Sequence, residues 1–171
     1  YNILYMYQLC TYDKICQLNL DFYSVPSGAS LTGVEISPAV TKILTYVFYE
    51  ATNLTSIMVT QPNTNYKDIG GVLFNKDGTT LIQYPAGKTR TSYEIPASVT
   101  IIGAGAFYEA TSLTTVTFES GSQLGSIGSS AFRSASSLTF INIPAGVTSI
   151  GENAFQDATS LTSINIPKGV A

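Results

Sequence analysis

The stretch Ile143–Ile166, IPAGVTSIGENAFQDATSLTSINI, decides the fold of this chain because it is one copy of a unit that returns along the sequence. Its last six residues read L-T-x-φ-x-φ, where φ is an apolar residue. The same pattern begins at Leu31, Leu54, Leu113, Leu138 and Leu161. Apart from one longer gap, the spacing between copies lies within the range of about 20–29 residues that is typical of arrays of stacked units, each too small to fold alone.

The rest of the unit is also repeated. Upstream of the strand pattern the copies share an I-G dipeptide, an A-F dipeptide, an alanine and a leucine at constant spacing. These features return in 95–118, 124–143 and 143–166, and in a looser form in 36–59. Residues 92–95 supply a further strand segment one period before 115–118, so the long gap holds one unit plus a short insertion.

Each unit predicts two local structures. The alternation x-φ-x-φ is typical of a strand with one buried face, and the proline that follows three copies ends that strand. Phe155, Ala158 and Leu161 are three residues apart, which predicts a short helical or 3₁₀ turn with one inward face. The glycine of the I-G dipeptide (Gly103, Gly128 and Gly151) suits a tight bend with unusual backbone dihedrals.

A single unit cannot bury its apolar side, whereas stacked units form a continuous core. We therefore expect an α/β-type solenoid with a parallel β-sheet on one face and short helical or 3₁₀ turns on the other. The phenylalanine of the A-F dipeptide should form a stacked spine rather than a ligand pocket. The expected spine is Phe48, Phe107, Phe132 and Phe155.

The repeat sets the boundaries of the chain's parts. Residues 1–30 follow it poorly and are expected to form an atypical N-terminal cap or repeat. Residues 31–171 form the solenoid, whose last repeat is incomplete, with a hairpin insertion at about 66–87. Asp77-Gly78 between apolar runs is a hairpin turn signal, although Asn75, Asp77 and Thr79 also loosely resemble a calcium loop. Cys10 and Cys16 could form a disulfide or remain free thiols.

The string I-P-x-x-V-T-x-I-G-x-x-A-F-x-x-A-x-x-L-T-x-I-x-I resembles the BspA-like family of leucine-rich repeats over about residues 31–171. The insertion Gly71–Gly87 also resembles one that recurs in these proteins. Members of this family are surface proteins of bacteria and some protists. The resemblance implies a right-handed superhelix, display at the cell surface or secretion, and adhesion or partner binding.

Composition excludes several classes of function. The chain has no histidine and two cysteines, which removes histidine-dependent nucleophiles and the usual zinc sites. Its 8 basic residues do not cluster, so no nucleic-acid surface is expected. No apolar run is long enough to insert into a membrane. We expect neither enzymatic activity nor a cofactor or bound metal.

The outward strand positions predict two rows of exposed side chains. The first row is Glu35, Met58, Glu94, Thr117, Asn142 and Asn165, and the second is Gly33, Ser56, Ser92, Thr115, Phe140 and Ser163. Phe140 and Met58 are apolar on a hydroxyl-rich face, so they are either anchors for a partner or packed against a neighbouring segment. The candidate binding residues are Phe140, Met58, Asn142, Asn165, Thr115, Thr117, Glu94 and Ser163.

Two functions are consistent with this pattern. The first is a binding or adhesion module that recognises a protein or a glycan on another surface through the sheet face. The second is a structural spacer or filament subunit that associates end to end with other copies, because an open sheet edge can template assembly.

Overall fold

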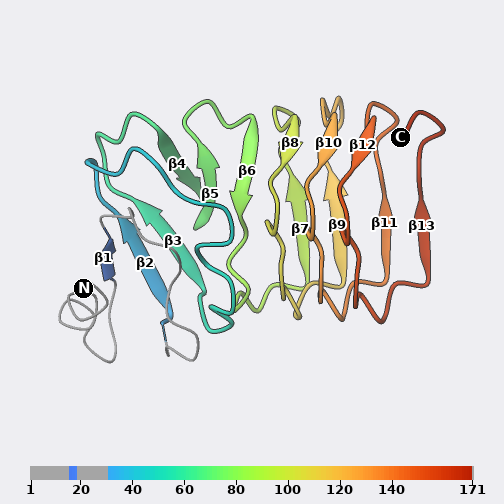
Figure 1. The fold of residues 1–171 in the computed structure, drawn as a ribbon, viewed down its shortest axis with the longest axis horizontal. Helices are drawn as coiled ribbons and strands as arrows, with labels where there is room; N and C mark the ends of the chain where they lie inside the picture. Colours follow the sequence, from blue (N-terminus) through green and yellow to red (C-terminus); the bar gives the residue numbers. More distant parts are fainter. Residues whose placement is uncertain (1–15, 19–30, 171) are drawn as a thin grey trace.

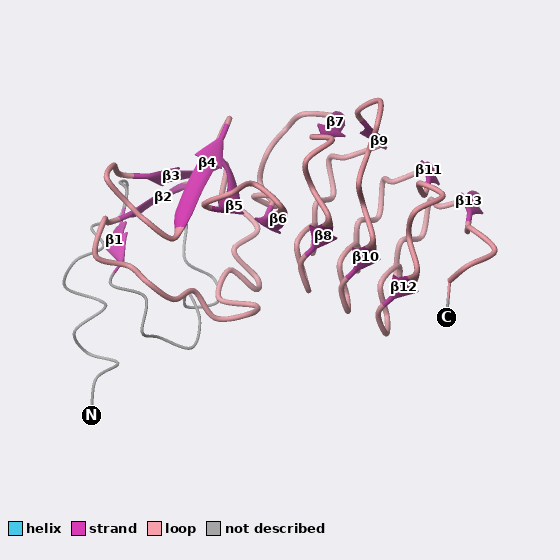
Figure 2. Cartoon of the chain, turned by 90° about the horizontal axis from the view of Figure 1, so that it is seen from above, coloured by secondary structure: helices cyan, strands magenta, loops and turns pink. Residues whose placement is uncertain are grey.

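The computed structural model describes residues 16–18 and 31–170. The chain winds as an elongated solenoid whose strands lie side by side along its long axis (Figure 1), as the repeat predicted. Seen from above, the coil has strands on two opposite sides and loops between them (Figure 2). No helix in the described part of the chain is long and apolar enough to cross a membrane.

The L-T-x-φ-x-φ segments form parallel strands, which confirms the predicted sheet, but in two pieces. The first piece has three strands in the order β1 (Cys16–Leu18), β2 (Gly33–Ile36) and β3 (Ser56–Val59). The second piece has four strands in the order β7 (Ser92–Ile95), β9 (Thr115–Phe118), β11 (Phe140–Asn142) and β13 (Ser163–Asn165). The two pieces are divided at the insertion, which lies between β3 and β7 in the sequence. These two strands do not pair with each other.

A further sheet, which the sequence analysis did not predict, lies on the opposite side of the coil. Its order is β12 (Ser149–Ile150), β10 (Ser126–Ile127), β8 (Ile101–Ile102), β6 (Thr80–Gln83), β5 (Val72–Asn75) and β4 (Tyr66–Ile69). The first three come from the segment before the I-G glycine. β5 and β6 form the predicted antiparallel hairpin, and β6 also pairs in parallel with β8. The insertion therefore supplies three strands, β6, β5 and β4, that continue the second sheet.

The segments expected to be helical or 3₁₀ turns contain no helix within the described residues, so that expectation was wrong. Each segment instead has two residues with positive φ, two positions before and two positions after the core phenylalanine. In the repeat of Phe132 these are Ser130 (φ 54°) and Ser134 (φ 57°). The N–H groups of Ser130, Phe132 and Ser134 donate to carbonyl oxygens of the next repeat at 2.7–2.9 Å. Left-handed residues interrupt a helix and turn alternate amides toward the neighbouring coil.

The I-G glycines serve a different purpose from the one expected. Gly103, Gly128 and Gly151 do not have positive φ values. A Cβ on Gly128 would lie 2.5 Å from the backbone nitrogen of Ala104, and one on Gly151 would lie 2.4 Å from that of Ser129. These glycines are therefore required by the close approach of successive coils and not by unusual dihedrals.

The core consists of two clusters that meet at the insertion. In the larger cluster, the rings of Phe107 and Phe132 stack at 4.7 Å, and those of Phe132 and Phe155 at 5.3 Å. Phe48 was wrongly placed in this spine, since it lies in the smaller cluster with residues of β2 and β3. Tyr84 from the insertion takes its position and stacks on Phe107 at 5.3 Å.

The insertion is fastened to the first repeat by a buried amide. Asn63 is 1 % exposed, and its Nδ2 donates to the carbonyl oxygens of Ser37 and Val40. Its Oδ1 accepts from the N–H groups of Asn65 and Tyr66, both at 2.8 Å. Both N–H groups and both lone pairs of this side-chain amide are thus used, as burial of an amide requires.

Burial of tyrosines predicts alkaline instability. Tyr84 is fully buried, and desolvation raises its pKa to about 12, although Arg90 opposes the shift. Burial also raises the pKa of Tyr93. Because the unfolded chain releases the Tyr84 proton near pH 10, the stabilisation from Tyr84 is complete below that pH and is lost between about pH 10 and pH 12, whereas that from Tyr93 extends to higher pH.

We expect the free energy of unfolding, measured by denaturant titration from pH 8 to pH 12, to fall across this interval. The fall should be at most about 1.4 kcal/mol per pH unit for each such group. Tyr84→Phe should flatten part of the fall while preserving the stack on Phe107. An unfolding free energy that is constant to pH 12, or a fall unaffected by Tyr84→Phe, would contradict the assignment.

Candidate functional site

The candidate site lies on the outer face of the four-stranded sheet. Strand alternation buries Val116 and Ile141 and turns their neighbours outward. In-register pairing then sets Thr115, Phe140 and Ser163 side by side, with Asn142 beside Asn165 in the adjacent row. We call this surface the Phe140 face. Its members are Glu94, Thr115, Thr117, Phe140, Asn142, Ser163 and Asn165.

Phe140 is the one large apolar side chain on this face that is substantially exposed, at 47 %. The residues paired with it on either side, Thr115 and Ser163, have short side chains. The ring therefore stands above its neighbours in the row and is not packed beneath an adjacent segment. Of the two interpretations of this residue, the structure favours an accessible side chain.

The two asparagines of the face form an amide ladder. Nδ2 of Asn165 donates to Oδ1 of Asn142 at 3.0 Å, and both residues are exposed. Within the described residues the NH₂ group of Asn142 and the Oδ1 of Asn165 have no side-chain hydrogen-bond partner. This hydrogen bond orients the two amides relative to each other. It leaves the NH₂ group of Asn142 as a donor and the Oδ1 of Asn165 as an acceptor that face solvent.

A row of threonines borders the face where its strands begin. The hydroxyls of Thr114, Thr139 and Thr162 each donate to the carbonyl oxygen of the equivalent threonine in the preceding repeat, at 3.0–3.3 Å. These hydroxyls are used in holding successive coils together. The sheet beneath the Phe140 face is therefore held by hydrogen bonds between successive coils and by its buried strand positions.

Met58 is the candidate residue that the structure does not bring to the Phe140 face. It is 51 % exposed on β3, in the three-stranded sheet, where it pairs with Glu35. β3 and β7 do not pair, so Met58 and Phe140 belong to different sheets. The sequence pattern could not reveal this separation, because Met58 and Phe140 both occupy outward strand positions of the repeat, in adjacent rows.

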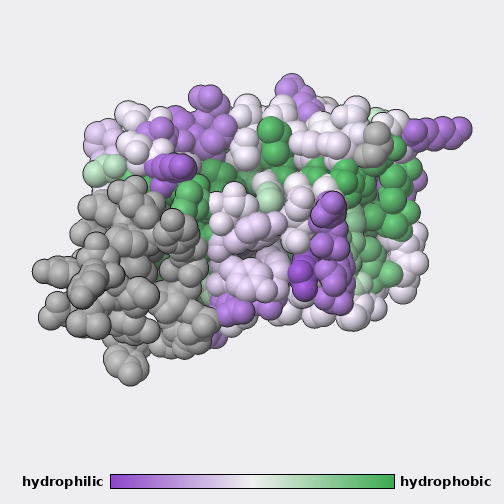
Figure 3. Space-filling view, viewed as in Figure 1, coloured by the Kyte–Doolittle hydropathy of each residue, from purple (hydrophilic) through white to green (hydrophobic). Residues whose placement is uncertain are grey.

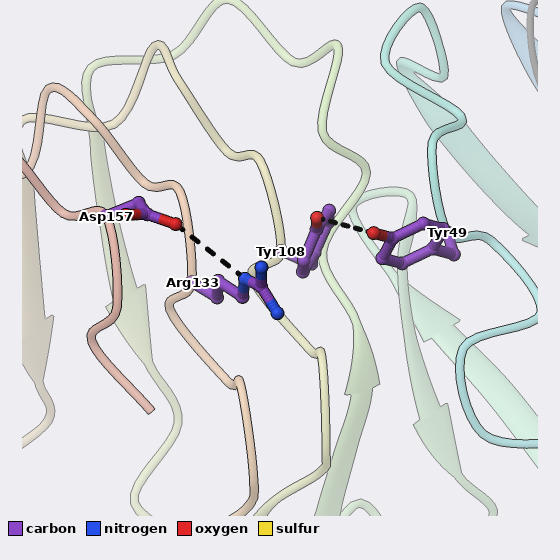
Figure 4. A network of polar contacts seen from close by, with 4 residues as sticks. All are labelled: Tyr49, Tyr108, Arg133 and Asp157. Carbon is purple, nitrogen blue, oxygen red and sulfur yellow. Dashed lines mark hydrogen bonds and ion pairs between the residues drawn. The ribbon is translucent and has the colours of Figure 1, made fainter. Parts of the chain in front are cut away.

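The turn side carries a polar row that the sequence analysis missed (Figure 4). The hydroxyl of Tyr108 donates to that of Tyr49 at 2.9 Å, and their ring centroids are 4.5 Å apart. Arg133 Nε lies 3.9 Å from the Asp157 carboxylate. Three of these residues directly follow a core phenylalanine in the sequence: Tyr49, Tyr108 and Arg133. This common position in the repeat could have predicted that they lie in one row. A long ion pair between partly exposed groups contributes little stability.

Electrostatics on the turn side follow from burial. Desolvation and the hydrogen bond with Tyr49 raise the pKa of Tyr108. Desolvation, followed by the charge of Glu50, raises the pKa of Glu109. These shifts come from the packing of side chains between coils.

Neither surface assembles a metal site. No group of three or more His, Cys, Asp or Glu side chains within the described residues could hold a metal ion. In the turn that resembles a calcium loop, the polar side chains bond to one another and to the backbone. Asn75 donates to Thr79 Oγ1 at 2.8 Å and accepts from the N–H of Thr80 at 2.9 Å. Cys10 lies outside the described residues, so the proposed pairing of Cys10 with Cys16 does too.

A coil of short repeats, with one parallel strand per turn and a polar outer sheet face, defines a leucine-rich-repeat protein. Within that class, the chain belongs to the BspA type leucine-rich repeat family, whose model matches residues 22–94 and 86–171 with six copies. Proteins of the leucine-rich-repeat class are typically non-enzymatic binding modules. A comparison with curated proteins finds no match.

Two solved bacterial structures are similar to the chain. A leucine-rich repeat protein from Eubacterium ventriosum is 37 % identical with a TM-score of 0.76, over 81 % of this chain and 37 % of that one. The pneumococcal vaccine antigen PcpA is 26 % identical with a TM-score of 0.55, over 82 % of this chain and 28 % of that one. The chain thus spans little more than a third of the first structure's length.

Proposed function

We propose that this chain is a binding or adhesion module displayed at a cell surface or secreted, and that it recognises its partner through the Phe140 face. The observation that carries the proposal is the 47 % exposed ring of Phe140 on a rigid, in-register sheet whose other outward groups are small or polar. An exposed aromatic side chain on such a platform is a typical anchor in recognition.

The comparisons support surface display. The chain belongs to a leucine-rich repeat family with bacterial structural neighbours, and one similar structure is that of a vaccine antigen, which suits exposure outside the cell. The outward residues of β9, β11 and β13 are uncharged and mostly polar. Such side chains can bind a partner through hydrogen bonds and do not need to carry a catalytic group.

Phe140→Ala is expected to reduce binding without unfolding the protein. The ring is half exposed and does not belong to the buried core cluster, so the melting temperature should change by no more than about 2 °C, as is usual for a surface substitution. Retention of protein-coated beads on cultured epithelial cells should fall about tenfold, because the loss of an anchor costs on the order of 1.4 kcal/mol or more.

Ile101→Ala is the matched control, since Ile101 is a similarly exposed apolar residue, at 43 %, on the opposite sheet. It should leave retention unchanged. Equal retention of the Phe140→Ala variant and the parent protein would remove the Phe140 face from the proposed function. A large loss of thermal stability would instead show that Phe140 is a core residue.

End-to-end assembly of copies is the alternative function. The last described coil carries β13 and β12. Hydrophobic residues gather at this end of the coil (Figure 3), where Phe155, Leu161 and Ile164 are only partly buried and Ile166 is 51 % exposed. Growth of oligomers or filaments with concentration, measured by size-exclusion chromatography and electron microscopy, would favour this structural role over adhesion.

A further inference from the structure

We propose that the ligand of the Phe140 face is an uncharged glycan, with one sugar ring stacked on Phe140 and its hydroxyls bonded to Asn142 and Asn165. This inference rests on the proposed function and narrows it to one class of ligand.

The charge of the face favours a neutral ligand. None of the residues of β7, β9, β11 and β13 is a lysine or an arginine, and Glu94 is the one charged residue in these strands. Sulfated or sialylated glycans, acidic peptides and phosphate groups therefore have no cation to pair with on these strands. A ligand that carries negative charge would also be repelled by the Glu94 carboxylate, which lies on β7, two strands away from Phe140.

The apolar content of the face is too small for the centre of a protein interface. A stable protein interface buries about 800 Å² on each partner and is most apolar at its core. Here one exposed aromatic ring is surrounded by the hydroxyls and amides of Thr115, Thr117, Asn142 and Ser163. A sugar matches this distribution, because one side of its ring presents C–H groups and its rim presents hydroxyls.

The positions of the groups also match a sugar ring. The face of an aromatic ring is negative and attracts polarised C–H groups stacked on it. Asn142 lies two residues from Phe140 on the same side of β11, and Asn165 lies on the adjacent strand at about 4.8 Å spacing. Their unpaired NH₂ and Oδ1 supply a donor and an acceptor, and a hydroxyl can use both.

The test uses the whole chain on an array of oligosaccharides terminating in galactose, glucose, mannose or N-acetylglucosamine, each beside a sialylated or sulfated form. We expect a subset of the neutral glycans to bind and their anionic forms to bind more weakly. Phe140→Ala should reduce that binding at least tenfold, Phe140→Tyr should retain it within about threefold, and Ile101→Ala should leave it unchanged.

A second measurement reports stacking directly. In saturation-transfer NMR, the C–H protons of one face of the bound sugar should receive the strongest signal from the protein's aromatic protons, and Phe140→Ala should abolish it. Asn142→Ala should weaken binding while leaving the aromatic signal in place. Absence of any neutral glycan binder, or binding that is indifferent to Phe140→Ala, would overturn the inference.

The failure of this inference can be told apart from failure of the proposed function. If Phe140→Ala abolishes cell retention but enzymatic deglycosylation of the cells does not, the face binds a protein and the glycan assignment is wrong. If neither treatment changes retention, the Phe140 face is not the binding surface, and both proposals fall. Loss of retention on both treatments supports both.

Discussion

Replacing Phe132 with alanine is expected to lower the free energy of unfolding by about 3–5 kcal/mol, the usual range for a buried phenylalanine. Phe132 is fully buried, and its ring stacks on Phe107 on one side and on Phe155 on the other. Its removal would leave a cavity that the rigid coils on both sides can close only partly. Because each coil is stabilised by its neighbours, the loss would also uncouple the repeats on either side.

Phe155→Ala is a matched comparison at the same position of the next repeat. Phe155 is only partly buried, so the same substitution should cost less than at Phe132. Urea denaturation followed by circular dichroism measures both values. A change of less than about 1 kcal/mol for Phe132→Ala would contradict the stacked spine, and equal losses at both positions would contradict its dependence on burial.

The second large effect is expected for Gly128→Ala. The added Cβ would lie 2.5 Å from the nitrogen of Ala104 and 2.8 Å from the carbonyl carbon of Gly103, both in the preceding coil. These are backbone atoms held by the hydrogen bonds between coils, so they cannot move aside as a flexible side chain can. We expect a loss of about 3 kcal/mol, the upper part of the range for overpacking.

Gly125→Ala separates this close approach from the general effect of replacing a glycine. A Cβ on Gly125 would meet one atom, the carbonyl oxygen of Thr100, at an ordinary distance of 3.7 Å. Neither glycine has a positive φ, so backbone strain does not distinguish them. Gly125→Ala should change the free energy of unfolding by less than about 1 kcal/mol. Equal stability of the two variants would show that the coil spacing is not rigid at Gly128.

The sequence was sufficient for features that depend on one repeat and its nearest copies. Strand alternation identified the inward residues and therefore the outward rows, including Phe140, Asn142 and Asn165. Turn chemistry at Asp77-Gly78 identified the hairpin, because that dipeptide suits a tight reversal whatever surrounds it. The aligned phenylalanines predicted a stack, and Phe107, Phe132 and Phe155 confirm it.

The non-helical turns could not be derived in this way. Residues three apart on one face are compatible with a helical turn and also with successive tight turns. The N–H of Phe107 donates to Ala131 and that of Glu109 to Arg133, both in the next coil. The hydrogen-bond acceptor of each backbone N–H group is determined by the position of the neighbouring coil. Periodicity within one repeat carries no information about that position. Asn153 and Gly105 at one of the left-handed positions were the available local signals.

The sequence by itself determined the unit, its buried side and the composition of its exposed rows, because these depend on spacing within one coil. Only the tertiary structure decided that the insertion divides the main sheet, that Tyr84 replaces Phe48 next to Phe107 in the aromatic stack, and that Met58 and Phe140 lie in different sheets. Each of these outcomes depends on how the insertion packs between the coils on either side of it, which spacing within one repeat does not describe. The close approach of successive coils is likewise a contact between residues about one repeat apart, as at Gly128 and Ala104.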